Sequence, residues 1–124
     1  MKEIQISDGE SEVMKVLWAK SPLALPELVE AVMLVNSWKY VTVKTLLQRL
    51  IKKGAVAQNG ARRNYLYSPL VKEEDYLDSE SQNFLERRFN ASPTEMLAFF
   101  VKRGKITGAD LKSLETHIAN LKDE

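Results

Sequence analysis

One amphipathic stretch, together with the residues directly after it, constrains the fold of this 124-residue chain more than any other feature. From Tyr40 to Lys53, apolar side chains recur at the three- and four-residue spacing of one helical face: Val43, Leu46, Leu47, Leu50 and Ile51. Gly54 is a residue type that commonly ends a helix. The β-prone runs Ala55–Gln58 and Tyr65–Ser68 then flank Asn59-Gly60, which is a strong hairpin signal. The sequence therefore predicts a helix that leads directly into a two-stranded hairpin.

Two shorter helices are predicted before this one. Ser7 and Glu10 have the spacing of a capping box, so the first helix begins after Ser7 and ends near Lys20. The second begins at Pro26, because proline suits a first helical turn, and ends near Asn36. Three helices followed by a hairpin with a basic tip is the element order of a winged helix-turn-helix domain.

The chain changes character after Pro69. Three further helices are predicted, beginning at Glu73, at Pro93 and after Thr107. They are short and apolar on more than one side, so by themselves they make a thin core. This favours packing against a second copy of the chain, and the alternative is that they fold back on the N-terminal domain. The predicted interface residues are Phe84, Leu85, Leu97, Phe100, Leu111, Leu114, Ile118 and Leu121.

The predicted fold class is therefore mainly α with a small β-hairpin. We expect a winged-helix DNA-binding domain at residues 1–71 and a helical homodimerisation domain at residues 72–124.

Charge is segregated along the chain. No acidic residue lies between Glu30 and Glu73, and the same stretch carries eight basic ones: Lys39, Lys44, Arg49, Lys52, Lys53, Arg62, Arg63 and Lys72. The whole chain has a net charge of only +1. A positive face on a nearly neutral protein suits a polyanionic partner, because each phosphate contact releases condensed counterions. From charge alone, a solvated basic surface is an equally good interpretation.

The polar face of the 40–53 helix separates these two interpretations. It has no carboxylate to pair with its cations, and its Thr, Gln, Lys and Arg donors are those that contact phosphates and base edges. Arg49 has an alternative role, an ion pair with Glu27 or Glu30, and Tyr40 has an alternative role in packing. The predicted DNA-binding residues are Lys39, Tyr40, Thr42, Lys44, Thr45, Gln48, Arg49 and Lys52, with Arg62 and Arg63 at the hairpin tip.

Composition argues against most other kinds of function. The chain has no cysteine, which excludes disulfides, thiolate metal sites and thiol catalysis, and it has a single histidine, His117. No paired catalytic groups, cofactor motif or metal-ligand set is recognisable, so we expect neither an enzyme nor a cofactor. The sequence shows no signal peptide and no membrane-spanning stretch, so we expect a cytoplasmic protein without membrane insertion.

Three segments carry a family resemblance. Trp38 to Gly54 reads W-x-Y-x-T-V-x-T-L-L-x-R-L-x-x-K-G, Tyr65 to Val71 reads Y-L-Y-S-P-L-V, and Ser11 to Trp18 reads S-E-V-M-x-V-L-W. Over residues 6–121 the chain resembles the penicillinase-repressor family of bacterial transcription factors, of the BlaI, MecI and CopY type. The resemblance implies a homodimeric repressor that occupies a pseudopalindromic operator in double-stranded DNA, one winged helix on each half-site.

The chain departs from that family's pattern at two points. Copper-responsive members carry a C-terminal cysteine motif for Cu(I), and this chain has no cysteine. The β-lactamase and methicillin-resistance repressors are cleaved at an Asn-Phe bond, which puts a membrane sensor-protease among the partners that the resemblance implies. The aligned pair here is Phe99-Phe100. The competing hypothesis for the whole chain is a winged-helix protein-interaction module whose basic face binds an acidic partner.

Overall fold

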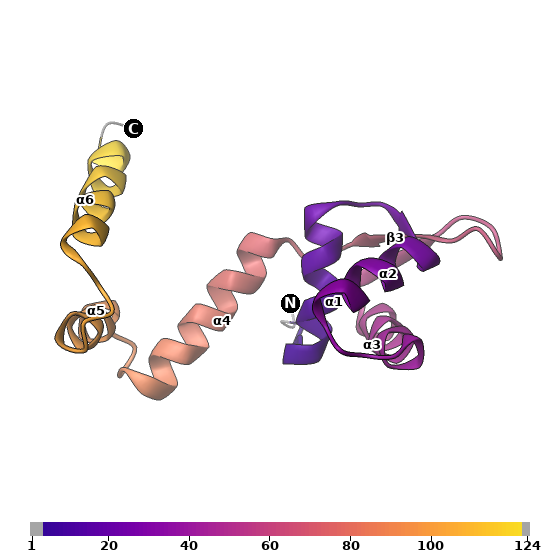
Figure 1. Cartoon of the computed structure of the whole chain (residues 1–124), viewed down its shortest axis with the longest axis horizontal. Helices are drawn as coiled ribbons and strands as arrows, with labels where there is room; N and C mark the ends of the chain where they lie inside the picture. Colours follow the sequence, from indigo (N-terminus) through magenta and orange to yellow (C-terminus); the bar gives the residue numbers. More distant parts are fainter. Residues whose placement is uncertain (1–3, 123–124) are drawn as a thin grey trace. The chain divides into compact units, whose positions relative to one another are not determined.

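The computed structural model describes residues 4–122. In chain order its elements are α1 (Asp8–Ala19), β1 (Leu23–Ala24), α2 (Leu25–Val35), α3 (Tyr40–Lys53), β2 (Val56–Asn59), β3 (Leu66–Pro69), α4 (Glu73–Arg88), α5 (Pro93–Lys102) and α6 (Gly108–Lys122) (Figure 1). The chain divides into two compact units, one extending through Tyr76 and the other starting at Leu77.

The first unit is a winged helix, which confirms the predicted fold class. Helices α1, α2 and α3 pack on one another, and a small antiparallel sheet follows with the strand order β1-β3-β2. The predicted hairpin is β2 and β3, in which Gln58 lies opposite Tyr67. The sheet also contains β1, which the sequence did not indicate, and which places Leu23 opposite Tyr67.

The core of this unit forms mainly where the apolar stripes of α1, α2 and α3 pack against one another. Val13, Met14 and Leu17 of α1 are buried together with residues of α2 and α3, namely Leu28, Val32, Val43, Leu47 and Leu50. Each such side chain contributes about 1.5–3 kcal/mol when it leaves water. Ile51, predicted on the same stripe, is only partly buried.

Two residues, Gly54 and Ala55, connect α3 to β2. Gly54 adopts a left-handed conformation with φ of 83°, and its N–H donates to the carbonyl of Ile51. The N–H of Ala55 donates back to the carbonyl of Leu50 at 2.9 Å. Ala55 therefore belongs to the helix cap, which explains why β2 begins at Val56 and not at Ala55 as the sequence predicted.

The first turn of α4 is attached to the winged helix through Trp18. The indole Nε1–H of Trp18 donates to the carbonyl of Val71 at 2.8 Å, and its ring lies 5.3 Å from that of Tyr76. Trp18 is thus a packing residue that joins α1 to the segment after the sheet.

The second unit is built differently. Its helices have good local signals: Ser92 caps α5 by accepting from the N–H of Glu95, and Thr107 and Asp110 cap α6 reciprocally. The rings of Phe84, Phe89, Phe99 and Phe100 form a cluster with centroids 5.8–6.4 Å apart. Nevertheless, α4, α5 and α6 contain no buried residue in the described part of the chain.

None of the helices within residues 4–122 is both long and apolar enough to cross a membrane.

We predict that Gly54→Ala destabilises the winged helix by about 1 kcal/mol, because a Cβ is disfavoured at positive φ. The space around Gly54 is open, with no heavy atom within 4 Å of the added Cβ, so the loss comes from backbone strain alone. Gly54→Asn should lose less stability than Gly54→Ala, since asparagine tolerates this conformation. Urea unfolding followed by Trp fluorescence measures both, because Trp18 and Trp38 are in the first unit. Equal losses of stability for the two variants would show that backbone strain at position 54 is not the cause.

Candidate nucleic-acid interface

Helix α3 has one face in the core and the opposite face in solvent. Because Val43, Leu46, Leu47 and Leu50 point inward, the helical period turns Thr42, Thr45, Gln48, Arg49 and Lys52 outward. Lys44 lies beside them, and Lys39 is the residue before the helix. All of these side chains are exposed. Because the inward face of α3 is fixed in the core, the predicted DNA-binding residues on its opposite face are exposed to solvent.

The side chains on this face have no partners within the described part of the chain. Among residues 4–122, no hydrogen bond or ion pair engages the side chains of Thr42, Lys44, Thr45, Gln48 or Lys52. The alternative ion pair of Arg49 with Glu27 or Glu30 is not formed in this part of the chain either. Their donors are free for an external acceptor.

Tyr40 differs from the other predicted residues. It lies at the first position of α3 and lines an apolar groove of about 430 Å³ on α2, together with Pro26, Val29, Glu30, Met33 and Leu34. Its side chain is still 46% exposed. Tyr40 therefore packs at the rim of the groove and also reaches solvent next to the polar face of α3.

The hairpin of β2 and β3 projects beyond the helices (Figure 1). Gly60 is required in its turn, because it has φ of 106° and an added Cβ would lie 3.0 Å from the carbonyl oxygen of Asn64. Arg62 and Arg63 are both exposed at this tip. Arg63 also lines a hollow of about 350 Å³ with the start of α2, so the two arginines have different surroundings.

Sequence reasoning missed Val41. It is 71% exposed, one helical turn before Thr45 and on the same face. An exposed apolar side chain in the middle of a polar face suits contact with the methyl group of thymine. Its position in the helical period places it on this face, but an apolar residue type is not one of the hydrogen-bond donors that indicate contact with DNA.

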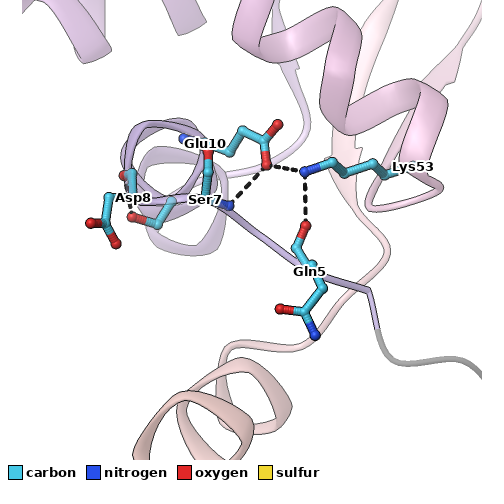
Figure 2. Close-up of polar contacts among 6 residues, drawn as sticks. Gln5, Ser7, Asp8, Glu10 and Lys53 are labelled. Carbon is cyan, nitrogen blue, oxygen red and sulfur yellow. Dashed lines mark hydrogen bonds and ion pairs between the residues drawn. The ribbon is translucent and has the colours of Figure 1, made fainter. Parts of the chain in front are cut away.

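Lys53, counted with the basic stretch, has an internal partner instead. Its ammonium Nζ donates to Oε1 of Glu10 at 2.5 Å and to the carbonyl of Gln5 at 2.8 Å (Figure 2). Glu10, which is 2% exposed, also accepts from the N–H of Ser7 at 2.9 Å and completes the predicted capping box. Burial raises the pKa of Glu10, but the hydrogen bonds from Lys53 and Ser7 and the charge of Lys53 outweigh it and leave this pKa below 4.5.

The residues predicted for dimerisation are on the second unit. Phe84, Leu97, Leu111, Leu114, Ile118 and Leu121 are exposed, and Leu85 and Phe100 are partly buried. On α6, Leu111, Leu114, Ile118 and Leu121 follow the three- and four-residue spacing of one stripe. His117 is exposed on the same helix, and no group of three possible metal ligands occurs among the described residues.

Comparison with known proteins agrees with this geometry. The family model described as penicillinase repressor matches residues 6–120. The chain belongs to the penicillinase repressor family. It is 36% identical to the penicillinase repressor of Bacillus licheniformis over 92% of this chain and 90% of that protein. It is 27% identical to the methicillin resistance regulatory protein MecI of Staphylococcus aureus (strain N315), over 91% of this chain and 92% of that protein.

Solved structures of this family match the winged helix. The DNA-binding domain of the repressor BlaI, in solution, aligns with a TM-score of 0.54 and 43% identity, over 61% of this chain and 94% of that one. The same values hold for monomeric Bacillus licheniformis BlaI in complex with the blaP half-operator. The matched share of the chain is consistent with the size of the first unit.

We predict that the stability difference between the protein and Glu10→Gln depends on pH. Because the native pKa of Glu10 lies below 4.5, the carboxylate stabilises the fold above about that pH. This contribution is lost as the pH falls through the native pKa, so the difference should be largest near pH 7 and shrink toward pH 3. Urea unfolding at pH 7, 5, 4 and 3 measures it. A difference of constant size would show that the Glu10 charge is not responsible.

Proposed function

We propose that this protein is a homodimeric, sequence-specific DNA-binding repressor that occupies a pseudopalindromic operator. The observation that carries the proposal is the outer face of α3, where Thr, Gln, Lys and Arg donors are exposed and unpaired on the third helix of a winged helix. Support comes from the half-operator complex of BlaI, a structure 43% identical over the winged helix. Repression by occupancy requires tight binding and no catalytic chemistry.

The position of each residue indicates its role. Thr42, Lys44 and Thr45 are in the first two turns of α3, the part that contacts base edges when this helix enters the major groove. Lys52 at the far end and Arg62 at the hairpin tip are placed for phosphates, which fix register without reading sequence. Val41, in the first turn of α3, supplies an apolar contact beside Thr42 and Thr45.

The second unit supports the homodimer. Helices without any buried residue in the described part of the chain gain little stability from their own packing, since most helical stability in proteins comes from a covered apolar face. A second copy covers the stripe on α6 with an identical one. Two identical winged helices would then read two half-sites whose centres lie about 34 Å or a multiple apart.

A membrane sensor-protease is not part of this proposal. Phe99-Phe100 occupies the place where the Asn-Phe pair of the cleaved repressors is expected, and both rings pack in the aromatic cluster with Phe89.

We predict that Lys44→Ala and Thr45→Ala weaken binding to the operator by roughly 1–3 kcal/mol each and change binding to random DNA less. The operator is first obtained by selection from a random duplex library, and affinities for it and for an unrelated duplex are then titrated at fixed salt. A protein-interaction module, the competing function, has no reason to enrich one duplex over another. Failure to enrich any sequence would therefore favour that alternative, and equal losses on both duplexes would make these residues phosphate contacts.

We predict that Ile118→Asp converts a full-length dimer into monomers, because a carboxylate on the α6 stripe would be buried against an identical one. Leu34→Asp is the matched control: Leu34 is 80% exposed on α2, compared with 45% for Ile118, and lies in the first unit. Sedimentation velocity measures both variants. Dissociation by Leu34→Asp with no effect of Ile118→Asp would move the interface to the winged helix and overturn this arrangement.

A further inference from the structure

One polar contact joins the start of α1 to the end of α3, across 43 positions of sequence. Lys53, the last residue of α3, donates to the carboxylate of Glu10 and to the backbone carbonyl of Gln5 (Figure 2). The pair is half buried, since the Glu10 side chain is 2% exposed and that of Lys53 is 37% exposed. A charge-assisted bond of this kind is directional and short.

Helix α1 also contacts the middle of α3, two turns before Lys53. A Cβ on Gly9, the residue before Glu10, would lie 3.4 Å from Cδ2 of Leu46. The apolar stripe of α3 determines how deeply the helix is buried, but apolar contacts are not directional and permit small rotations and shifts along the helix axis. The bond between Glu10 and Lys53 is directional, so it limits these rotations and shifts.

Lys52 and Lys53 are therefore different kinds of residue, although they are neighbours of the same type. Lys52 points to solvent from the outer face of α3, with no hydrogen bond or ion pair to its side chain among residues 4–122. Lys53 lies beside the buried stripe, and its charge is neutralised internally.

Building on the proposed function, we propose that Glu10 and Lys53 are positioning residues for DNA reading. They fix the rotation and tilt of α3 against α1, align Thr42, Lys44 and Thr45 with the base edges, and do not themselves touch DNA. A site must be held within about 0.5 Å and 10–20° to be productive. Because the 14 residues of α3 span roughly 20 Å at about 1.5 Å per residue, a tilt of about 2° at the Lys53 end moves its first turn by about that distance.

The first test compares two ways of removing a negative charge from α1. Glu12→Gln breaks the exposed pair of Glu12 with Lys15 on the same helix, whereas Glu10→Gln breaks the pair with α3. If only net charge matters, both variants bind operator slightly more tightly, because the protein becomes more positive. We expect Glu10→Gln instead to bind operator roughly tenfold more weakly, the loss of about one base contact, and to bind random DNA no more weakly than the unsubstituted protein does. Identical behaviour of the two variants would overturn the proposal.

The second test compares the two lysines. Lys52→Met should lower affinity for operator and random DNA alike and reduce the slope of log K against log salt by about 1 per protomer. Lys53→Met should lower affinity for operator alone and leave the slope unchanged. A reduced slope for Lys53→Met would make Lys53 a phosphate contact and overturn the proposal.

The double variant Glu10→Gln/Lys53→Met separates positioning from simple loss of stability. Removing both partners avoids an unpaired buried charge, so the midpoint temperature of thermal unfolding should be higher for the double variant than for Lys53→Met. Operator affinity should remain low, because the directional bond is still missing. Operator affinity that recovers together with stability would show a purely structural pair and overturn the proposal. If the unsubstituted protein prefers no duplex sequence, the proposed function fails before these variants are compared.

Discussion

The packing of α3 against α1 and α2 determines the rest of the winged helix. Four side chains of α3, Val43, Leu46, Leu47 and Leu50, enter the core, and the helical period then leaves no freedom in which residues face outward. One face of α3 thus packs in the core, and the opposite face forms the candidate interface. A one-residue insertion or deletion within the stripe would bury a polar residue and turn part of the interface toward the core, so stability and recognition cannot vary independently here.

Local patterns were sufficient for the main elements of the fold. The apolar period from Val43 and the glycine at position 54 placed α3 at its observed ends, and the capping box at Ser7 placed the start of α1. What local patterns missed depends on contacts between distant segments. β1 has two residues and exists only because Leu23 and Ala24 meet β3. The contact of Lys53 with Glu10 is not predictable from local patterns, because the capping box already explains Glu10 and nothing in the sequence relates two residues so far apart.

The two units differ in what holds them together. The winged helix encloses a continuous apolar core that extends from Ile6 to Tyr67. The unit from Leu77 onward has well-capped helices and an aromatic cluster, yet most of its large apolar residues are exposed and none in the described part is buried. Its cap residues were readable from sequence because capping is local, whereas the residue types alone could not distinguish a thin core from a surface that awaits a partner. The proposed dimer follows from this difference.

The cap between α3 and β2 limits how the hairpin can vary among proteins built on this plan. Because Gly54 and Ala55 return their N–H groups to the last turn of the helix, β2 starts from a fixed point and a fixed direction. An insertion there would remove the cap and detach the strand from the core at Val56. Added or lost residues are better tolerated between Ala61 and Asn64, where the turn is exposed. Evolution and protein engineering can therefore adjust the reach of the hairpin at its tip while the angle between hairpin and helix stays constant.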